Sequence, residues 1–312
     1  MSAADGTATP AEATTERRRP MIENRKLRLF LANKSAVGGL IVLAIIALAA
    51  FFPTAFSSIP PQQTYDSQKD PEGLGARGEA FAVAPSLDHV MGTDNLGRDI
   101  FSNVVHGARV SLWIGFVAVG IAGIFGVLIG GIAGMTGGWT DAILMRAMDV
   151  MLSFPSIVLA LLIVTMLGQG IWPVMIAVGI AGVPRFARQT RAEVIGLRER
   201  EFVLACEALG LPVWRIFFRH VLPNALGPLT VLASLSIAAA VLEAAGLGFL
   251  GLGAPSGVPE WGRILADNRA NLRDFPWVAV FPGLAIAVTV LGFNLVGDGI
   301  RDAFDPTMTL RR

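Results

Sequence analysis

Cysteine, histidine and charged side chains are all scarce in this sequence. Cys206 is the only cysteine among 312 residues, so the chain can form neither an internal disulfide nor a cysteine-based metal site. The three histidines, His89, His106 and His220, are far apart in sequence and predict no ligand cluster. Charged residues make up 16% of the chain, whereas soluble globular proteins contain about a quarter. Because so few charges cannot cover a soluble protein of this length, we expect a bilayer to surround the apolar side chains.

The motifs of ATP-binding loops and of common hydrolases are also missing. A phosphate-binding loop needs a Gly-Lys pair, and none of the lysines, Lys26, Lys34 and Lys69, follows a glycine. The sequence contains no Gly-x-Ser-x-Gly and no His-Glu-x-x-His segment. The net charge of +1, without a basic stripe, predicts no nucleic-acid partner. We therefore predict no catalytic residues, no metal ligands and no cofactor bound by this chain.

Apolar runs of helix length are what the sequence has in abundance, since 53% of its residues are hydrophobic. A bilayer admits only helices and closed barrels, and no alternating segments of about ten residues suggest a barrel. We therefore predict an all-α polytopic membrane protein with about six transmembrane helices. The expected spans cover residues 36–53, 111–135, 150–167, 171–182, 225–247 and 277–295.

Basic residues are unevenly distributed among the segments that join these spans. They cluster before the first span, within residues 183–224 and after the last span, and they are few in residues 54–108. By the positive-inside rule, both termini and the loop 183–224 are expected in the cytoplasm, and the segment 54–108 outside. Residues 1–35 are predicted to be a disordered basic tail.

Residues 200–224 predict a helix–turn–helix within the cytoplasmic loop. Gly210 and Pro212 break the chain, and a proline is well placed in the first turn of a new helix. The second helix, residues 213–221, is amphipathic and is expected to end at Pro223. Its apolar surface is offered by Trp214, Phe217 and Phe218. An exposed helix of this kind predicts docking into a groove of a partner, with a purely structural loop as the alternative.

Ionisable residues within the expected spans need a reason, because burying a charge in a bilayer is costly. Arg146 and Asp149 are three residues apart near the inner end of the third span, and we predict that they form a structural ion pair. Glu243 lies deeper, in the fifth span. It either lines a translocation path, where it would contact a cationic peptide terminus, or bonds a neighbouring helix.

Two further polar groups lie at the ends of the expected helices. Asn294, Asp298 and Asp302 stand at the inner end of the sixth span, where we predict a junction with the cytoplasmic loop or with a partner. Asp94, Arg98 and Asp99 precede the second span, where we predict a capping network, and contact with an external protein is a further hypothesis.

Residues 200–224 resemble the cytoplasmic EAA loop of ABC importer permeases. The family pattern is Glu-Ala-Ala, three residues, Gly, nine residues, then Ile-x-Leu-Pro. The matching positions are Ala205, Gly210, Leu222 and Pro223, and the departures are Leu204, Cys206 and His220. Because Glu207 lies almost one turn beyond the motif Glu, we hypothesise that it restores a carboxylate to a neighbouring face.

Five further segments extend the resemblance to about residues 92–306. In family order they are similar to the peptide, nickel and oligopeptide branch of these permeases, and within it to the C-type subunit. The segments are GTDNLGRDIFSNVVHGARVSL (92–112), GGWTDAILMRAMDVMLSFPSIVLAL (137–161), LREREFV (197–203), GFLGLG (248–253) with Glu260–Trp261–Gly262, and FNLVGDGIRDAFDP (293–306).

The resemblance implies an ABC type-1 permease core over residues 109–300, with an additional first span before it and a cytoplasmic C-terminus at 301–312. It also implies a cell-membrane complex with a B-type permease subunit, two ATPase subunits that bind ATP and Mg, and an external solute-binding protein. The ATPase-coupling residues would be Ala205, Glu207, Ala208, Gly210, Trp214, Phe217, Phe218, Leu222 and Pro223.

The same resemblance predicts import of di- or oligopeptides. Nickel, glutathione or a sugar conjugate are the alternatives within the branch. An ion-gradient-driven secondary transporter and a membrane scaffold are the alternatives from other classes.

Overall fold

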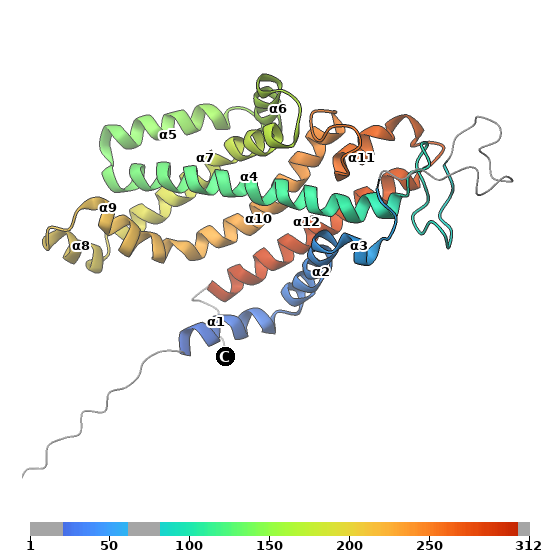
Figure 1. Cartoon of the computed structure of the whole chain (residues 1–312). Coiled ribbons are helices and arrows are strands. Elements are labelled where there is room, and N and C mark those ends of the chain that lie inside the picture. Colours follow the sequence, from blue (N-terminus) through green and yellow to red (C-terminus); the bar gives the residue numbers. More distant parts are fainter. Residues whose placement is uncertain (1–20, 62–81, 305–312) are drawn as a thin grey trace, which may run out of the picture.

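The computed structural model describes residues 21–61 and 82–304, and predictions that concern residues 1–20, 62–81 and 305–312 lie outside this range. The described part is a bundle of long helices (Figure 1), with one isolated bridge between Thr93 and Asp99 and no named strand. The elements are α1 (Met21–Ala32), α2 (Lys34–Phe51), α3 (Pro53–Phe56), α4 (Ile100–Thr136), α5 (Gly138–Leu152), α6 (Ser156–Leu167), α7 (Ile171–Arg198), α8 (Glu201–Ala208), α9 (Val213–Ile216), the π-helical η2 (Phe217–Val221), α10 (Leu222–Phe249), α11 (Trp261–Asp267), the 3-10 helix η3 (Arg269–Asn271) and α12 (Trp277–Phe304).

Five of these helices are long and apolar enough to cross a membrane, and the bent pair α5–α6 would make a sixth span. The five are α2, α4, α7, the continuous helix made by α9, η2 and α10, and α12. The predicted all-α fold of about six transmembrane helices, with an additional N-terminal helix before the core, is confirmed.

The pair α4 and α7 forms the centre of the bundle, and glycines on α4 allow the close contact. Gly126, Gly130 and Gly134 recur every four residues and therefore lie on one face of the helix. A methyl group added at Gly130 would meet the carbonyl oxygen of Ala187, and one added at Gly134 would meet the side chain of Val194. Small residues thus let the two backbones approach, as they do in other membrane helix pairs. Figure 1 shows α4 running the length of the molecule.

Two spans are longer than the apolar runs from which they were predicted. Helix α4 begins at Ile100 and not at residue 111, because Asp99 caps it by accepting a hydrogen bond from the backbone N–H of Ser102 at 2.7 Å. Residues 100–108 of the predicted outer segment 54–108 are therefore helical and belong to α4. Helix α7 continues to Arg198, so residues 183–198 are helical and continuous with the fourth predicted span.

The third predicted span, residues 150–167, is not one straight helix. Helices α5 and α6 meet at 90° across a break at residues 153–155. Pro155 lacks a backbone N–H and disfavours a helical conformation in the residue before it, so the helix ends there and restarts at Ser156 in a new direction.

Residues 21–32 form helix α1, so the predicted disordered tail through residue 35 is wrong for this part. Phe30 lies against Gly299 of α12, where an added methyl group would be 3.0 Å from its ring. Asn33 donates from Nδ2 to Oδ2 of Asp302 at 2.9 Å, and its Oδ1 caps the N-terminus of α2. Helix α1 and the residue after it therefore contact α12, and the local sequence does not reveal these tertiary contacts.

Candidate functional site

Helices α8 and α9 form the predicted helix–turn–helix at one end of the bundle (Figure 1). The N–H of Gly210 donates to the carbonyl of Glu207 at 2.9 Å, and the N–H of Leu211 donates to that of Cys206 at 3.2 Å. This pair of bonds is a Schellman motif, which requires a left-handed residue after the helix, and Gly210 has a φ of 71°. Pro212 then stands at the start of α9. Gly210 therefore sets the angle between the two helices.

The aromatic residues of the second helix separate into two environments. Trp214 is 62% exposed and Phe218 is 51% exposed, whereas Phe217 is only 6% exposed. The ring of Phe217 lies on Gly131 of α4. Phe217 thus anchors the helix to the bundle, and Trp214 and Phe218 form its apolar outer surface. On α8, Ala205, Glu207 and Ala208 are all exposed, while Leu222 is partly buried.

Pro223 does not end the second helix, which corrects the prediction. The backbone N–H of Leu222 donates to the carbonyl of Phe217, five residues earlier, and this π-helical turn leads directly into α10. Pro223 follows this π turn directly and so stands inside a helix, where the π turn alters the hydrogen-bond pattern in which its missing N–H would have taken part. One continuous helix therefore runs from Val213 to Phe249, so the helix–turn–helix is rigidly joined to a span.

Three arginines on α7 form a ladder of ion pairs. The sequence analysis had assigned these arginines to the loop 183–224. Arg191 closes two short bonds with Asp141 of α5, at 2.5 and 2.6 Å. Arg188 pairs with Asp149 of α5 at 2.5 Å. The third arginine, Arg185, faces α10 and is described below. Their spacing of three residues was the available sequence clue, because it places them along neighbouring positions of one helix.

The predicted pair between Arg146 and Asp149 is wrong, because Asp149 pairs with Arg188 instead. Arg146 is exposed on α5. A partner three residues away on the same helix was outcompeted by one 39 residues later on a neighbouring helix.

Glu243 contacts two neighbouring helices within the bundle. Its Oε1 accepts a hydrogen bond from Oγ of Ser156 on α6 at 2.6 Å. The same oxygen lies 3.9 Å from Nη2 of Arg185 on α7, and that nitrogen also lies 3.4 Å from Oγ of Ser156. The carboxylate is therefore joined to both helices.

The inner end of α12 contacts the N-terminal helices and not the helix–turn–helix. Asp302 accepts the hydrogen bond from Asn33 described above. Asn294 is partly buried and Asp298 is exposed. At Asp302 this end of α12 therefore contacts the segment between α1 and α2, whereas the prediction was a junction with the cytoplasmic loop or with a partner.

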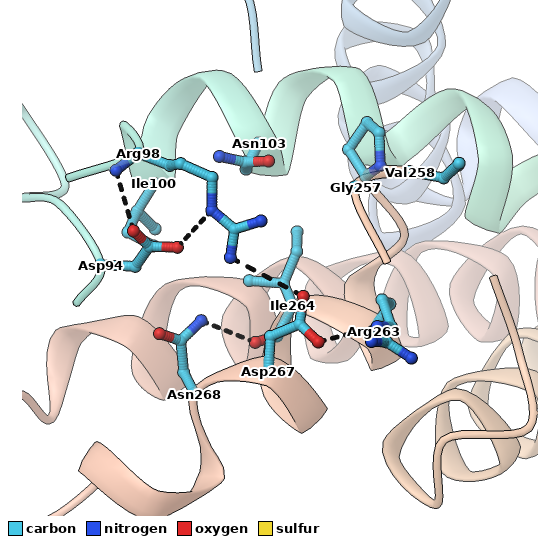
Figure 2. Close-up of a pocket in the computed structure, with 11 residues that line it drawn as sticks. Asp94, Arg98, Ile100, Asn103, Gly257, Val258, Arg263, Ile264, Asp267 and Asn268 are labelled. Atoms are coloured by element: carbon cyan, nitrogen blue, oxygen red, sulfur yellow. Dashed lines mark hydrogen bonds and ion pairs between the residues drawn. The ribbon is translucent and has the colours of Figure 1, made fainter. Parts of the chain in front are cut away.

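The opposite end of the molecule carries a network of charges around a small cavity. Asp94 accepts from the side chain of Arg98 at 2.7 Å, and Figure 2 shows that guanidinium between Asp94 and Asp267. Asp267 in turn pairs with Arg263 at 2.7 Å. With Asp99 as the N-cap of α4, the predicted capping network is confirmed, and it also fastens α11 to the segment before α4.

Glu260, which the sequence analysis named only as part of a family-like segment, is the buried N-cap of α11. It is 1% exposed, and its two oxygens accept the backbone N–H groups of Gly262 and Arg263, each at 2.8 Å. Ser111 of α4 also donates to it, at 3.4 Å. Burial raises the pKa of Glu260 to about 7, against the lowering effect of these donors. An acidic residue just before a short helix was the clue in the sequence.

We expect Glu260 to make the stability of the protein fall as pH rises. Its pKa is higher in the folded state than the ordinary value of 4.5, so its contribution is greatest below that value and is lost as pH rises through about 7. In Glu260→Gln the neutral amide stands in for the protonated acid, so this dependence should disappear. Melting curves of the detergent-solubilised protein at pH 5 and pH 8 test this. An equal change in melting temperature for both proteins would contradict the prediction.

The architecture is that of a multi-pass membrane protein of the permease class, with an exposed helix–turn–helix continuous with one span. Residues 126–310 match the family model described as "Binding-protein-dependent transport system inner membrane component". Residues 25–74 match the model "N-terminal TM domain of oligopeptide transport permease C". The chain therefore belongs to the family of binding-protein-dependent transport system inner membrane components.

Curated relatives extend the similarity over most of the chain. The chain is 46% identical to the dipeptide transport system permease protein DppC of Alkalihalophilus pseudofirmus, over 88% of this chain and 87% of the relative. It is 40% identical to the glutathione transport system permease protein GsiD of Pectobacterium atrosepticum, over 90% of each chain. It is 37% identical to the oligopeptide transport system permease protein OppC of Bacillus subtilis, over 96% of this chain and 94% of the relative.

A solved structure shares the fold. It is titled as an inward-facing conformation of the MetNI methionine ABC transporter, and it matches with a TM-score of 0.52 at 18% identity. The match covers 65% of this chain and 97% of the other.

Proposed function

We propose that this chain is one permease subunit of an ATP-driven, binding-protein-dependent importer of di- and oligopeptides in the cell membrane. Family membership and the names of the relatives support this proposal. The chain supplies half of the translocation path, and a B-type permease subunit supplies the other half. An external binding protein delivers the peptide. Two ATPase subunits bind ATP and Mg, so this chain has no catalytic role.

The continuity of α9, η2 and α10 is the observation that carries the coupling role. Trp214 and Phe218 lie exposed at the end of a helix that continues through the bundle to Phe249. An exposed amphipathic helix with aromatic anchors fits a groove on a partner. When an ATPase subunit moves, a helix held in its groove moves with it, and a continuous helix carries that motion into the membrane.

In this proposal both termini lie in the cytoplasm, and the basic clusters that flank the first and last spans support that orientation. The helix–turn–helix then faces the ATPase subunits, and α11 with the segment 82–99 faces the binding protein. Glutathione is the second candidate substrate, because one relative carries that name.

Co-purification of the tagged chain in gentle detergent tests the proposal. We expect a second permease and ATPase subunits in the complex, together with ATPase activity. Phe218→Asp should release the ATPase subunits, because it puts a charge on the docking surface, while Phe218→Leu should keep them. Purification of the wild-type chain without any ATPase would refute the coupling role and favour a transporter driven by an ion gradient.

A further inference from the structure

Of the three ion pairs that the arginines of α7 make, the longest is the one between Arg185 and Glu243 of α10. Their charged atoms lie 3.9 Å apart, whereas Arg191 closes two bonds of 2.5 and 2.6 Å with its carboxylate. The side chain of Arg185 is 46% exposed, and that of Glu243 is 17% exposed. Guanidinium groups offer five N–H donors, so Arg185 has the capacity to bind a second anion. The pair thus joins the helices less firmly than its neighbour on the ladder.

The surface around Arg185 does not suit lipid. A half-exposed charge within an apolar span faces water or another protein, because contact with hydrocarbon is too costly. Between α4, α7 and α10 this surface also contains a cavity of about 20 Å³, which has room for one water molecule. Small side chains on the walls leave this space, and they are Ala118, Ala122, Gly182, Ser236 and Ala239.

We propose that Arg185 and Glu243 form a binding site for a zwitterionic peptide on the wall of the translocation path. Arg185 binds the carboxylate of the peptide, and Glu243 binds its ammonium group. This inference rests on the proposed function of the chain. Of the two roles that the sequence analysis gave Glu243, lining the translocation path or bonding a neighbouring helix, the inference assigns it the first.

The exchange of partners explains why a pair of opposite charges suits this task. When the peptide enters, Arg185 exchanges the carboxylate of Glu243 for that of the peptide, and Glu243 exchanges the guanidinium for the peptide ammonium group. No charge within the membrane is therefore left unpaired. The ends of an extended dipeptide are about 7 Å apart, so the pair must separate to receive both. The present distance of 3.9 Å therefore corresponds to a closed site.

Thiol labelling tests whether this surface lines the path. In a Cys206→Ala background, Ser236→Cys and Ala239→Cys place thiols on the cavity wall, and Leu242→Cys is the control on the same helix. Leu242 is 56% exposed but does not line the cavity. The probe is a membrane-impermeant cationic thiol reagent, applied to the complete complex in liposomes during ATP turnover. We expect labelling of both cavity thiols, protection by a dipeptide, and no labelling of Leu242→Cys. Unlabelled cavity thiols, or equal labelling of the control, would overturn the inference.

Transport by the double variant Arg185→Gln with Glu243→Gln tests the binding role. Removing both charges leaves neither unpaired, so the complex should assemble. We expect dipeptide uptake to fall by about tenfold or more, as charged hydrogen bonds to the peptide are lost. Uptake at the wild-type rate, or a complex that fails to assemble, would assign the pair to structure alone. Absence of peptide uptake by the wild-type complex would instead refute the proposed function.

Discussion

Gly210→Pro is expected to abolish ATP-driven uptake while the chain still inserts into the membrane. Gly210 has a φ of 71°, and proline holds φ near about −65°, so the turn between α8 and α9 cannot form. Under the proposed function, Trp214 and Phe218 would then no longer dock on the ATPase, and hydrolysis would lose its link to transport. Uptake of labelled dipeptide and ATPase activity, measured in the same liposomes, report the two effects separately.

Gly210→Ala is the matched control for this variant. A methyl group there would have no atom within 4 Å, so its only penalty is the left-handed backbone, about 1–2 kcal/mol. We expect this variant to retain most of the uptake. Normal uptake by Gly210→Pro would show that the turn does not transmit the motion of the ATPase.

Gly130→Leu should prevent the chain from folding, because it forces apart the two central helices. Even the first methyl group would collide with the carbonyl of Ala187 on α7, and a backbone atom cannot move aside as a side chain can. Overpacking of a core typically costs about 1–3 kcal/mol, and this site lies at or beyond the upper end of that range. Size-exclusion chromatography after detergent extraction should show aggregates in place of a single sharp peak.

Gly120→Leu makes the same change on the same helix at a position where an added methyl group would have no atom within 4 Å. Gly120 is exposed, so we expect a profile like that of the wild type. If both variants eluted as wild type does, the close packing of α4 on α7 would not be needed for folding.

Local patterns in the sequence predicted the parts of the structure that depend on near neighbours. Gly210 and Pro212 marked the turn of the helix–turn–helix, and the structure has its turn there. Asp99 and Asp94 were placed in a capping network from their position before a span, and both accept backbone N–H groups. Caps and tight turns are satisfied by residues only a few positions away, so a single sequence contains the information.

Contacts between distant helices were beyond these patterns. The sequence did not reveal that Arg188 and Arg191 of α7 pair with carboxylates of α5. Asp149 was predicted to pair with Arg146, its neighbour in sequence, because the sequence did not show that Arg188 lies beside it in the fold. The continuous passage from η2 into α10 was also missed, because a proline normally ends a helix, whereas here a π turn directly precedes Pro223.

The π turn at residues 217–221 also fixes a rotational setting. Because an α-helix advances by 3.6 residues per turn, gaining or losing one residue rotates everything beyond it by about 100°. The extra residue in η2 therefore decides which way Trp214 points when the direction of α10 is given. The π turn thus sets the rotation of α9 relative to α10, between the span and the surface that would meet an ATPase. A single extra residue would therefore set the direction in which a motion of the ATPase reaches the span.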